Sequence, residues 1–168
     1  MKKVSIFGVS LLTMFALATV LFYNSCTDDP CKDVVCVNGE CVDGTCACDA
    51  GYEGTDCSTE QRAKFVGVYS VTGTVSCPVT GGGTIPTSTL NISNSSSDVS
   101  KIVIDFAGAL TVIGTVSGTS ITIESQLVSG FTYTGSGSIN GSNITLAINE
   151  FDATIPETCV YNLTGPKQ

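Results

Sequence analysis

Residues 31–57 read CKDVVCVNGECVDGTCACDAGYEGTDC, with six cysteines separated by gaps of four, four, four, one and eight residues. A segment this short cannot bury a hydrophobic core of its own, so it needs disulfides or a metal ion to fold. Disulfides are favoured over zinc, because the chain has no histidine and this stretch has no C-x2-C pair. Six cysteines can pair in about 15 ways, and their spacing alone does not choose between them.

The end of this stretch resembles an EGF-like domain. Cys46-Ala47-Cys48 is followed by Gly51-Tyr52, then by Gly54 and Cys57, in the order typical of that family. The resemblance covers residues 31–57 and implies three disulfides: Cys31–Cys41, Cys36–Cys46 and Cys48–Cys57. Two hairpin-turn signals lie between the earlier cysteines: Asn38-Gly39 and Asp43-Gly44.

Charge is scarce and unevenly distributed along the chain. Of 168 residues only 13% are charged, and the formal net charge is −8. Residues 27–60 hold nine acids and one base, whereas residues 61–168 hold six acids and four bases. The acidic balance argues against a nucleic-acid partner, and abundant Gly, Ser and Thr favour an extracellular β protein over a helical bundle.

The N-terminus has the pattern of an export signal. Met1-Lys2-Lys3 is basic, and an uncharged apolar run at 4–22 ends shortly before Ser25 and Cys26. A small residue and a cysteine at this place resemble the loose lipobox of Bacteroidetes-type surface lipoproteins. The acidic residues that follow resemble their surface-export tag. An uncleaved membrane anchor with a free thiol at Cys26 is the alternative.

The lipoprotein resemblance implies a signal peptide at residues 1–25 and lipidation of Cys26, followed by a tether over residues 26–30. It also implies a lipid-anchored protein of the outer membrane, exposed at the cell surface. The cysteine count agrees, because nine cysteines leave Cys26 over once six are assigned to 31–57 and two more pair with each other.

Residues 65–168 follow a polar connector at 58–64 and alternate between apolar and polar side chains, as β-strands do. Eight alternating runs occur: 65–71, 89–92, 101–106, 110–116, 121–124, 131–139, 144–148 and 160–163. The breaks between several of them are turn-like: Gly81-Gly82-Gly83, 94–98, Ala107-Gly108, Gly118, Ser129-Gly130 and Asn140-Gly141. Such short gaps fit hairpins, so we expect an antiparallel sheet closed into an eight-stranded up-and-down β-barrel, with a β-sandwich as the alternative.

Cys77 and Cys159 share the parity of the apolar positions in the first and last runs. Both side chains should therefore point inward, where a Cys77–Cys159 disulfide would join the closing strands. The opening of the domain, Phe65-Val66-Gly67-Val68-Tyr69, resembles the G-x-W start of lipocalin-type barrels, with tyrosine in place of tryptophan. The resemblance extends to the small lipocalin-like β domains of bacterial surface lipoproteins and implies such a domain at residues 65–168.

The sequence has few candidate catalytic residues. Without histidine, the chain has no imidazole-based triad or metal site. Glu150 and Asp152 are the near acid pair of the β domain, and we expect them to form a solvated loop face. The sequence predicts that the protein is not an enzyme and uses no cofactor.

Calcium is the one ion with candidate ligands. Asp28 and Asp29 precede Cys31, and Asp43 follows Cys41, at positions that resemble those of calcium-binding EGF-like domains. Pro30 stands where that family usually has glutamate, so we expect no specific metal site.

The sequence therefore predicts a membrane-anchored binding or adhesion module, acting through its EGF-like and β domains on an unidentified protein or glycan. The alternative is a carrier of small apolar ligands inside the barrel, which needs roughly 300 Å3 of open space. Six inward aromatic residues favour a filled interior: Phe65, Tyr69, Phe106, Phe131, Tyr133 and Tyr161.

Overall fold

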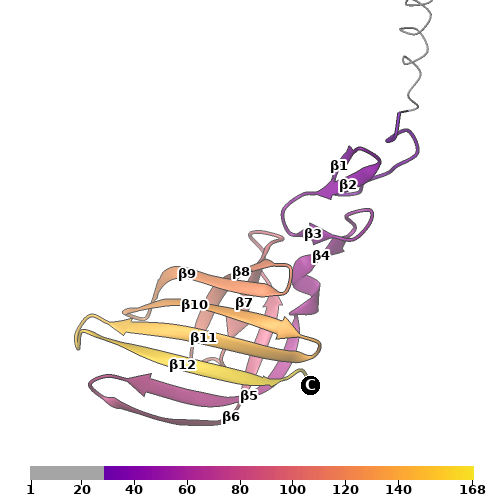
Figure 1. Ribbon diagram of the computed structural model, residues 1–168. Coiled ribbons are helices and arrows are strands. Elements are labelled where there is room, and N and C mark those ends of the chain that lie inside the picture. Colours follow the sequence, from indigo (N-terminus) through magenta and orange to yellow (C-terminus); the bar gives the residue numbers. More distant parts are fainter. Residues whose placement is uncertain (1–28) are drawn as a thin grey trace, which may run out of the picture.

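The computed structural model describes residues 29–168, which form a small cysteine-rich module followed by a β-barrel (Figure 1). The signal-peptide, Cys26 and Asp28 predictions lie outside these described residues. The module contains four short strands, and a 3-10 helix joins it to the barrel. Their bounds are β1 Gly39–Val42, β2 Thr45–Cys48, β3 Tyr52–Glu53, β4 Thr59–Glu60 and η1 Gln61–Lys64. No helix within residues 29–168 has the length and hydropathy needed to cross a membrane.

Three disulfides hold the module together where a hydrophobic core is lacking. They are Cys31–Cys41, Cys36–Cys46 and Cys48–Cys57, the pairs that the EGF-like resemblance implies. Asp43 and Gly44 form the β1–β2 turn with φ values of 49° and 83°, as a tight hairpin turn requires. Asn38-Gly39 does not form a hairpin turn, because Gly39 already begins β1.

Residues 65–168 form the closed, eight-stranded antiparallel barrel that the alternating runs predict. The strands are β5 Gly67–Cys77, β6 Gly81–Asn94, β7 Lys101–Asp105, β8 Thr111–Ser117, β9 Ser120–Val128, β10 Phe131–Asn140, β11 Asn143–Asp152 and β12 Glu157–Pro166. Each strand pairs with its sequence neighbours, and β12 returns to pair with β5. The all-β fold class and the barrel are thus confirmed, and the sandwich alternative is wrong.

The two ends of the barrel differ. We call the end beside η1 the near end, and the end that carries the Cys77–Cys159 disulfide the far end. This disulfide lies next to the pair Val160↔Ser76, where the hydrogen bonding between β12 and β5 stops. It therefore joins the first and last strands of the barrel at the far end of their seam.

One turn prediction for the barrel is also wrong. Gly81-Gly82-Gly83 does not separate two strands but begins β6, and the turn lies at residues 78–80. A Cβ on Gly82 would lie 2.4 Å from the carbonyl oxygen of Val75 on β5. The missing side chain therefore lets β6 approach β5 closely instead of turning the chain.

The near end of the barrel is densely packed. Phe65 and Tyr69 are fully buried, together with Leu90, Ile102 and Ile144. The Tyr69 hydroxyl donates a hydrogen bond to the Phe65 carbonyl oxygen at 2.7 Å, so the one polar atom of this aromatic pair is satisfied. This packing closes the end of the barrel that faces the cysteine-rich module.

Candidate ligand-binding site

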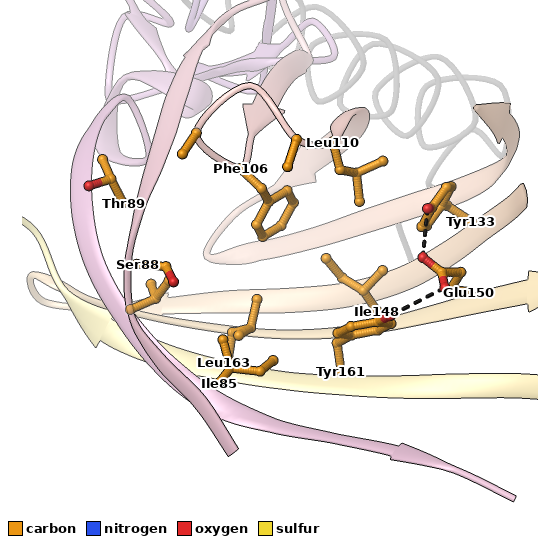
Figure 2. A pocket seen from close by; sticks show the side chains of 13 residues that line it. Ile85, Ser88, Thr89, Phe106, Leu110, Tyr133, Ile148, Glu150, Tyr161 and Leu163 are labelled. Carbon is orange, nitrogen blue, oxygen red and sulfur yellow. Dashed lines mark hydrogen bonds between the residues drawn. The ribbon is translucent and has the colours of Figure 1, made fainter. Parts of the chain in front are cut away.

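The far half of the barrel contains an open cavity of about 520 Å3 (Figure 2). The prediction that aromatic side chains fill the interior is wrong for this half, although Phe65 and Tyr69 do fill the near end. The lining is mostly apolar and comes from the inner face of the barrel and the β7–β8 turn. It consists of Val71, Ile85, Ser88, Thr89, Phe106, Ala107, Ala109, Leu110, Tyr133, Ile148, Glu150, Tyr161 and Leu163.

The cavity exists because two neighbouring strands differ in length. β6 has 14 residues and β7 has five. β7 pairs with β6 only over the four positions from Asn91↔Asp105 to Asn94↔Ile102. Toward the far end of the barrel, before Asn91, β6 pairs with β5 alone, and the β7–β8 turn faces it across the opening of the cavity. Ser88 and Thr89 of β6 and Phe106 of the turn line the two sides of this opening (Figure 2).

Two glycines lie beside cavity-lining residues on neighbouring strands. Gly73 lies opposite Leu163, and Gly135 lies opposite Ile148. Both partners line the cavity, but a Cβ on either glycine would meet backbone atoms of the paired strand, at Asn162 for Gly73 and at Ala147 for Gly135. These glycines therefore let neighbouring strands approach closely, as Gly82 does.

A cluster of three polar side chains forms one side of the cavity. The Tyr133 hydroxyl donates to Glu150 Oε2 at 2.6 Å, and the Tyr161 hydroxyl donates to Glu150 Oε1 at 3.2 Å. Glu150 on β11 directly opposes Tyr133 on β10, while Tyr161 comes from β12. Figure 2 shows the two tyrosines on either side of the carboxylate.

The environment of this cluster keeps the phenols protonated. Burial raises the pKa of Tyr133, and the adjacent Glu150 carboxylate raises it further. Burial also raises the pKa of Tyr161, again with a contribution from the Glu150 charge. Both phenols are therefore neutral hydrogen-bond donors at neutral pH, and Glu150 carries the only formal charge among the lining residues.

The prediction that Glu150 and Asp152 form a solvated loop face is wrong for Glu150. Glu150 continues the inward series Ile144, Ile148 on β11 and is half-buried. Glu150 has the same parity as the inward residues of the run at 144–148, so extending that alternation by two residues predicts an inward Glu150. Asp152 instead accepts hydrogen bonds from the backbone N–H and the hydroxyl of Thr154 in the following turn.

Within residues 29–168, one group of potential metal ligands is close-packed: Cys77, Glu157 and Cys159. Its cysteines are joined as a disulfide and supply no thiolate. The Glu157 carboxylate accepts hydrogen bonds from both Val79 N and the Thr80 hydroxyl, which explains its burial. The group therefore closes the far end of the seam and does not form a metal centre.

Two of the three candidate calcium ligands, Asp29 and Asp43, lie in the described residues, and each takes part in a separate local structure. Asp29 Oδ1 accepts a hydrogen bond from Cys31 N at 2.9 Å. Asp43 occupies the β1–β2 turn with a positive φ. Each acid thus has a local role, and the expectation of no specific metal site stays a prediction.

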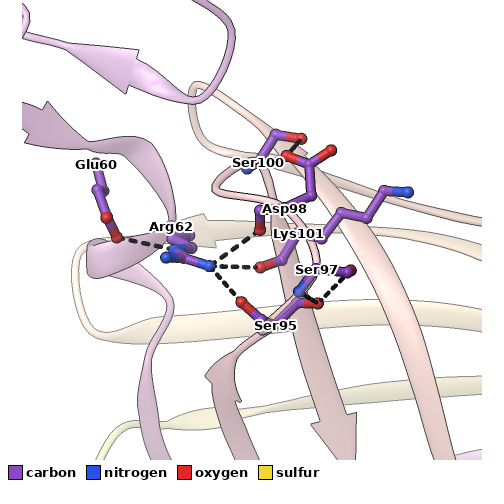
Figure 3. Close-up of polar contacts among 7 residues, drawn as sticks. All are labelled: Glu60, Arg62, Ser95, Ser97, Asp98, Ser100 and Lys101. Atoms are coloured by element: carbon purple, nitrogen blue, oxygen red, sulfur yellow. Dashed lines mark hydrogen bonds and ion pairs between the residues drawn. The ribbon is translucent and has the colours of Figure 1, made fainter. Parts of the chain in front are cut away.

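The connector between module and barrel has a defined structure (Figure 3). Arg62 Nη1 donates to the carbonyl oxygens of Ser95 at 2.8 Å and Asp98 at 3.0 Å, with Lys101 O at 3.5 Å. Its Nε pairs with Glu60 at 2.8 Å. A single guanidinium therefore holds the β6–β7 loop against η1.

Gln61 makes a second bridge across the same joint. Its Nε2 donates to Tyr52 O in the module, and its Oε1 accepts from Gly118 N in the β8–β9 turn of the barrel. Its backbone N–H also donates to Gly51 O. These contacts join the module to the closed near end and leave the cavity at the opposite end.

No family model matches this sequence, and no curated protein is detectably similar to it. Among solved structures, it is similar to a Bacteroides ovatus protein of unknown function from structural genomics, known from a crystal structure at 2.40 Å. The two share 13% sequence identity with a TM-score of 0.47, over 61% of this chain and 41% of that protein. The chain thus spans less than half of that protein's length.

Proposed function

We propose that the protein is a non-enzymatic, lipid-anchored surface protein that binds a small, largely apolar molecule in the far half of its barrel. The observation that carries this proposal is the cavity of about 520 Å3 with its mainly apolar lining. Its volume exceeds the roughly 300 Å3 at which ligand pockets begin, and its walls combine many apolar side chains with a few convergent polar groups. The carrier alternative is therefore better supported than a barrel filled with side chains.

The arrangement of the whole chain fits such a role. The cysteine-rich module and η1 attach to the closed near end, so the cavity lies at the end of the barrel opposite the module. Lipidation at Cys26 would hold the module at the membrane and present the cavity outward. An intact Met1, or a free thiol on Cys26, in the mass spectrum of the mature protein would contradict this anchoring.

Ligand binding is tested with residues 27–168, which contain every residue of the described fold. The neutral fluorescent probe N-phenyl-1-naphthylamine should bind with a stoichiometry of one and brighten on entering the apolar cavity. The Leu163→Phe variant should abolish this binding, because Leu163 lines the cavity and the larger ring occupies its volume. The neighbouring exposed residue supplies the matched control, since Asn162→Phe adds the same ring outside and should leave probe binding unchanged.

Adhesion is the second candidate function, and one surface feature favours it. Val35, Val37 and Val42 of the cysteine-rich module are 78%, 60% and 51% exposed. Exposed apolar side chains of this kind are frequent at recognition surfaces when they form a patch. A glycan or protein array that binds the native chain but not the triple Val→Ser variant would support adhesion, whereas equal binding of the two would exclude these valines.

A further inference from the structure

We propose that the molecule bound in the cavity carries an amine, whose ammonium group lies against Glu150. This inference rests on the proposed function, because it names the chemical class of ligand for the same cavity. The observation behind it is a carboxylate that lines a mostly apolar cavity, with no cationic side chain among the lining residues.

The hydrogen-bonding capacity of Glu150 leaves room for a ligand. A carboxylate has about four acceptor sites, two on each oxygen. Tyr133 occupies one site on Oε2 and Tyr161 occupies one on Oε1. Each oxygen therefore retains acceptor capacity, and the two phenols hold the carboxylate in a defined orientation. The free sites accept hydrogen bonds, so the matching ligand group is a donor.

The charge of the cavity selects among donors. No Lys or Arg side chain lines it, so the Glu150 charge is not neutralised by the walls. An ammonium group would supply that neutralisation with a charge-assisted hydrogen bond, which is about twice as strong as a neutral one. A ligand carboxylate would instead meet the like charge of Glu150, which is unfavourable. The cavity should therefore reject fatty acids and accept amines of similar size.

Aromatic rings around the cavity favour the same class. Phe106, Tyr133 and Tyr161 all contribute to the lining. A cation near an aromatic face gains additional electrostatic attraction, and the effect increases when the cation is desolvated. The apolar residues Ile85, Ile148 and Leu163 would cover the hydrocarbon part of the ligand.

The test uses three probes with one chain and three head groups: decylamine, decan-1-ol and decanoate at pH 7. Each is titrated against N-phenyl-1-naphthylamine bound to residues 27–168. We expect decylamine to displace the dye at a concentration at least tenfold lower than decan-1-ol, and decanoate to be the weakest competitor. Equal potency of the three, or preference for decanoate, overturns the inference without requiring any variant.

Variants locate the effect. Glu150→Gln should bring decylamine and decan-1-ol within about threefold of each other while N-phenyl-1-naphthylamine still binds. Glu124→Gln is the matched control, since it removes the same charge from an exposed position on β9 and should preserve the amine preference. If the preference persists in Glu150→Gln or disappears in Glu124→Gln, the amine responds to the net charge of the protein and the inference is wrong.

The two proposals fail in different ways. If neither the neutral dye nor any decyl compound binds, the proposed ligand-binding function fails together with this inference. If the dye binds and Leu163→Phe removes it, but amines have no advantage, the ligand-binding function stands and only the amine assignment is overturned.

Discussion

The Cys77–Cys159 disulfide should contribute more to the stability of the barrel than any other single link. It closes a loop with a sequence separation of 82 and joins β5 to β12 beside the last hydrogen-bonded pair of their seam. The chain-entropy relation assigns roughly 4.5 kcal/mol to a loop of this length at 25 °C. The same relation assigns about 2.6 kcal/mol to the Cys48–Cys57 link, whose separation is 9.

The perturbation is the double variant Cys77→Ala/Cys159→Ala, which removes the link without leaving a thiol to mispair. We expect its free energy of unfolding to fall by about 3–4.5 kcal/mol relative to the native chain. Urea unfolding followed by far-ultraviolet circular dichroism measures this difference. The denaturant slope should rise as well, because the unlinked denatured chain exposes more surface.

The control is the Cys77→Ser/Cys159→Ser double variant, which removes the same link with a different side chain. Similar losses in the two variants attribute the effect to the covalent link and not to side-chain packing at Cys159, which is 8% exposed. A loss below about 1 kcal/mol in both variants would refute the reasoning, since the seam would then hold the barrel ends together without the disulfide.

Three further outcomes are expected. Gly165→Ala should lower the free energy of unfolding by about 3 kcal/mol in urea titrations, because the new Cβ would lie 1.9 Å from the Ser70 carbonyl oxygen. An unchanged urea midpoint would contradict this close approach. The hydrogen bond from the Thr80 side chain lowers the pKa of Glu157, so its stabilising contribution is present above the ordinary value of 4.5 and is lost as the pH falls below it. The stability difference between the native chain and Glu157→Gln should accordingly shrink from pH 7 to pH 3, and a constant difference would exclude this linkage. Arg62→Lys keeps the charge but not the planar fork, so cleavage of the β6–β7 loop in limited proteolysis should accelerate. Lys101→Arg should not change the rate, because Lys101 meets Arg62 only through its backbone carbonyl oxygen, which the substitution keeps.

Much of the architecture follows from local patterns in the sequence. The cysteine-rich segment at residues 31–57 is too short for a conventional core, and the disulfides of the structure are the pairs that the family resemblance implies. Period-2 alternation specifies which face each residue occupies, and hairpin-length gaps leave little choice of topology. Eight alternating runs therefore predict the closed antiparallel barrel, and the inward parity of Cys77 and Cys159 predicts their proximity.

The glycine run at residues 81–83 shows where local patterns mislead. Glycine is frequent in turns because it adopts positive φ, but it is also used where two backbones approach closely. The sequence does not distinguish these uses. The close approach of Gly82 to Val75 O exists only once β5 and β6 are paired.

The candidate site was decided by tertiary structure. Alternation determines that Tyr133, Glu150 and Tyr161 face inward, but not how much space separates the walls they belong to. That space depends on β7 ending after five residues while β6 continues. Strand length and register are properties of pairs of segments, because each hydrogen bond needs a partner strand. The sequence by itself therefore determined the barrel and the face of each residue, whereas only the assembled walls decided that the far half is hollow and that a carboxylate lines it.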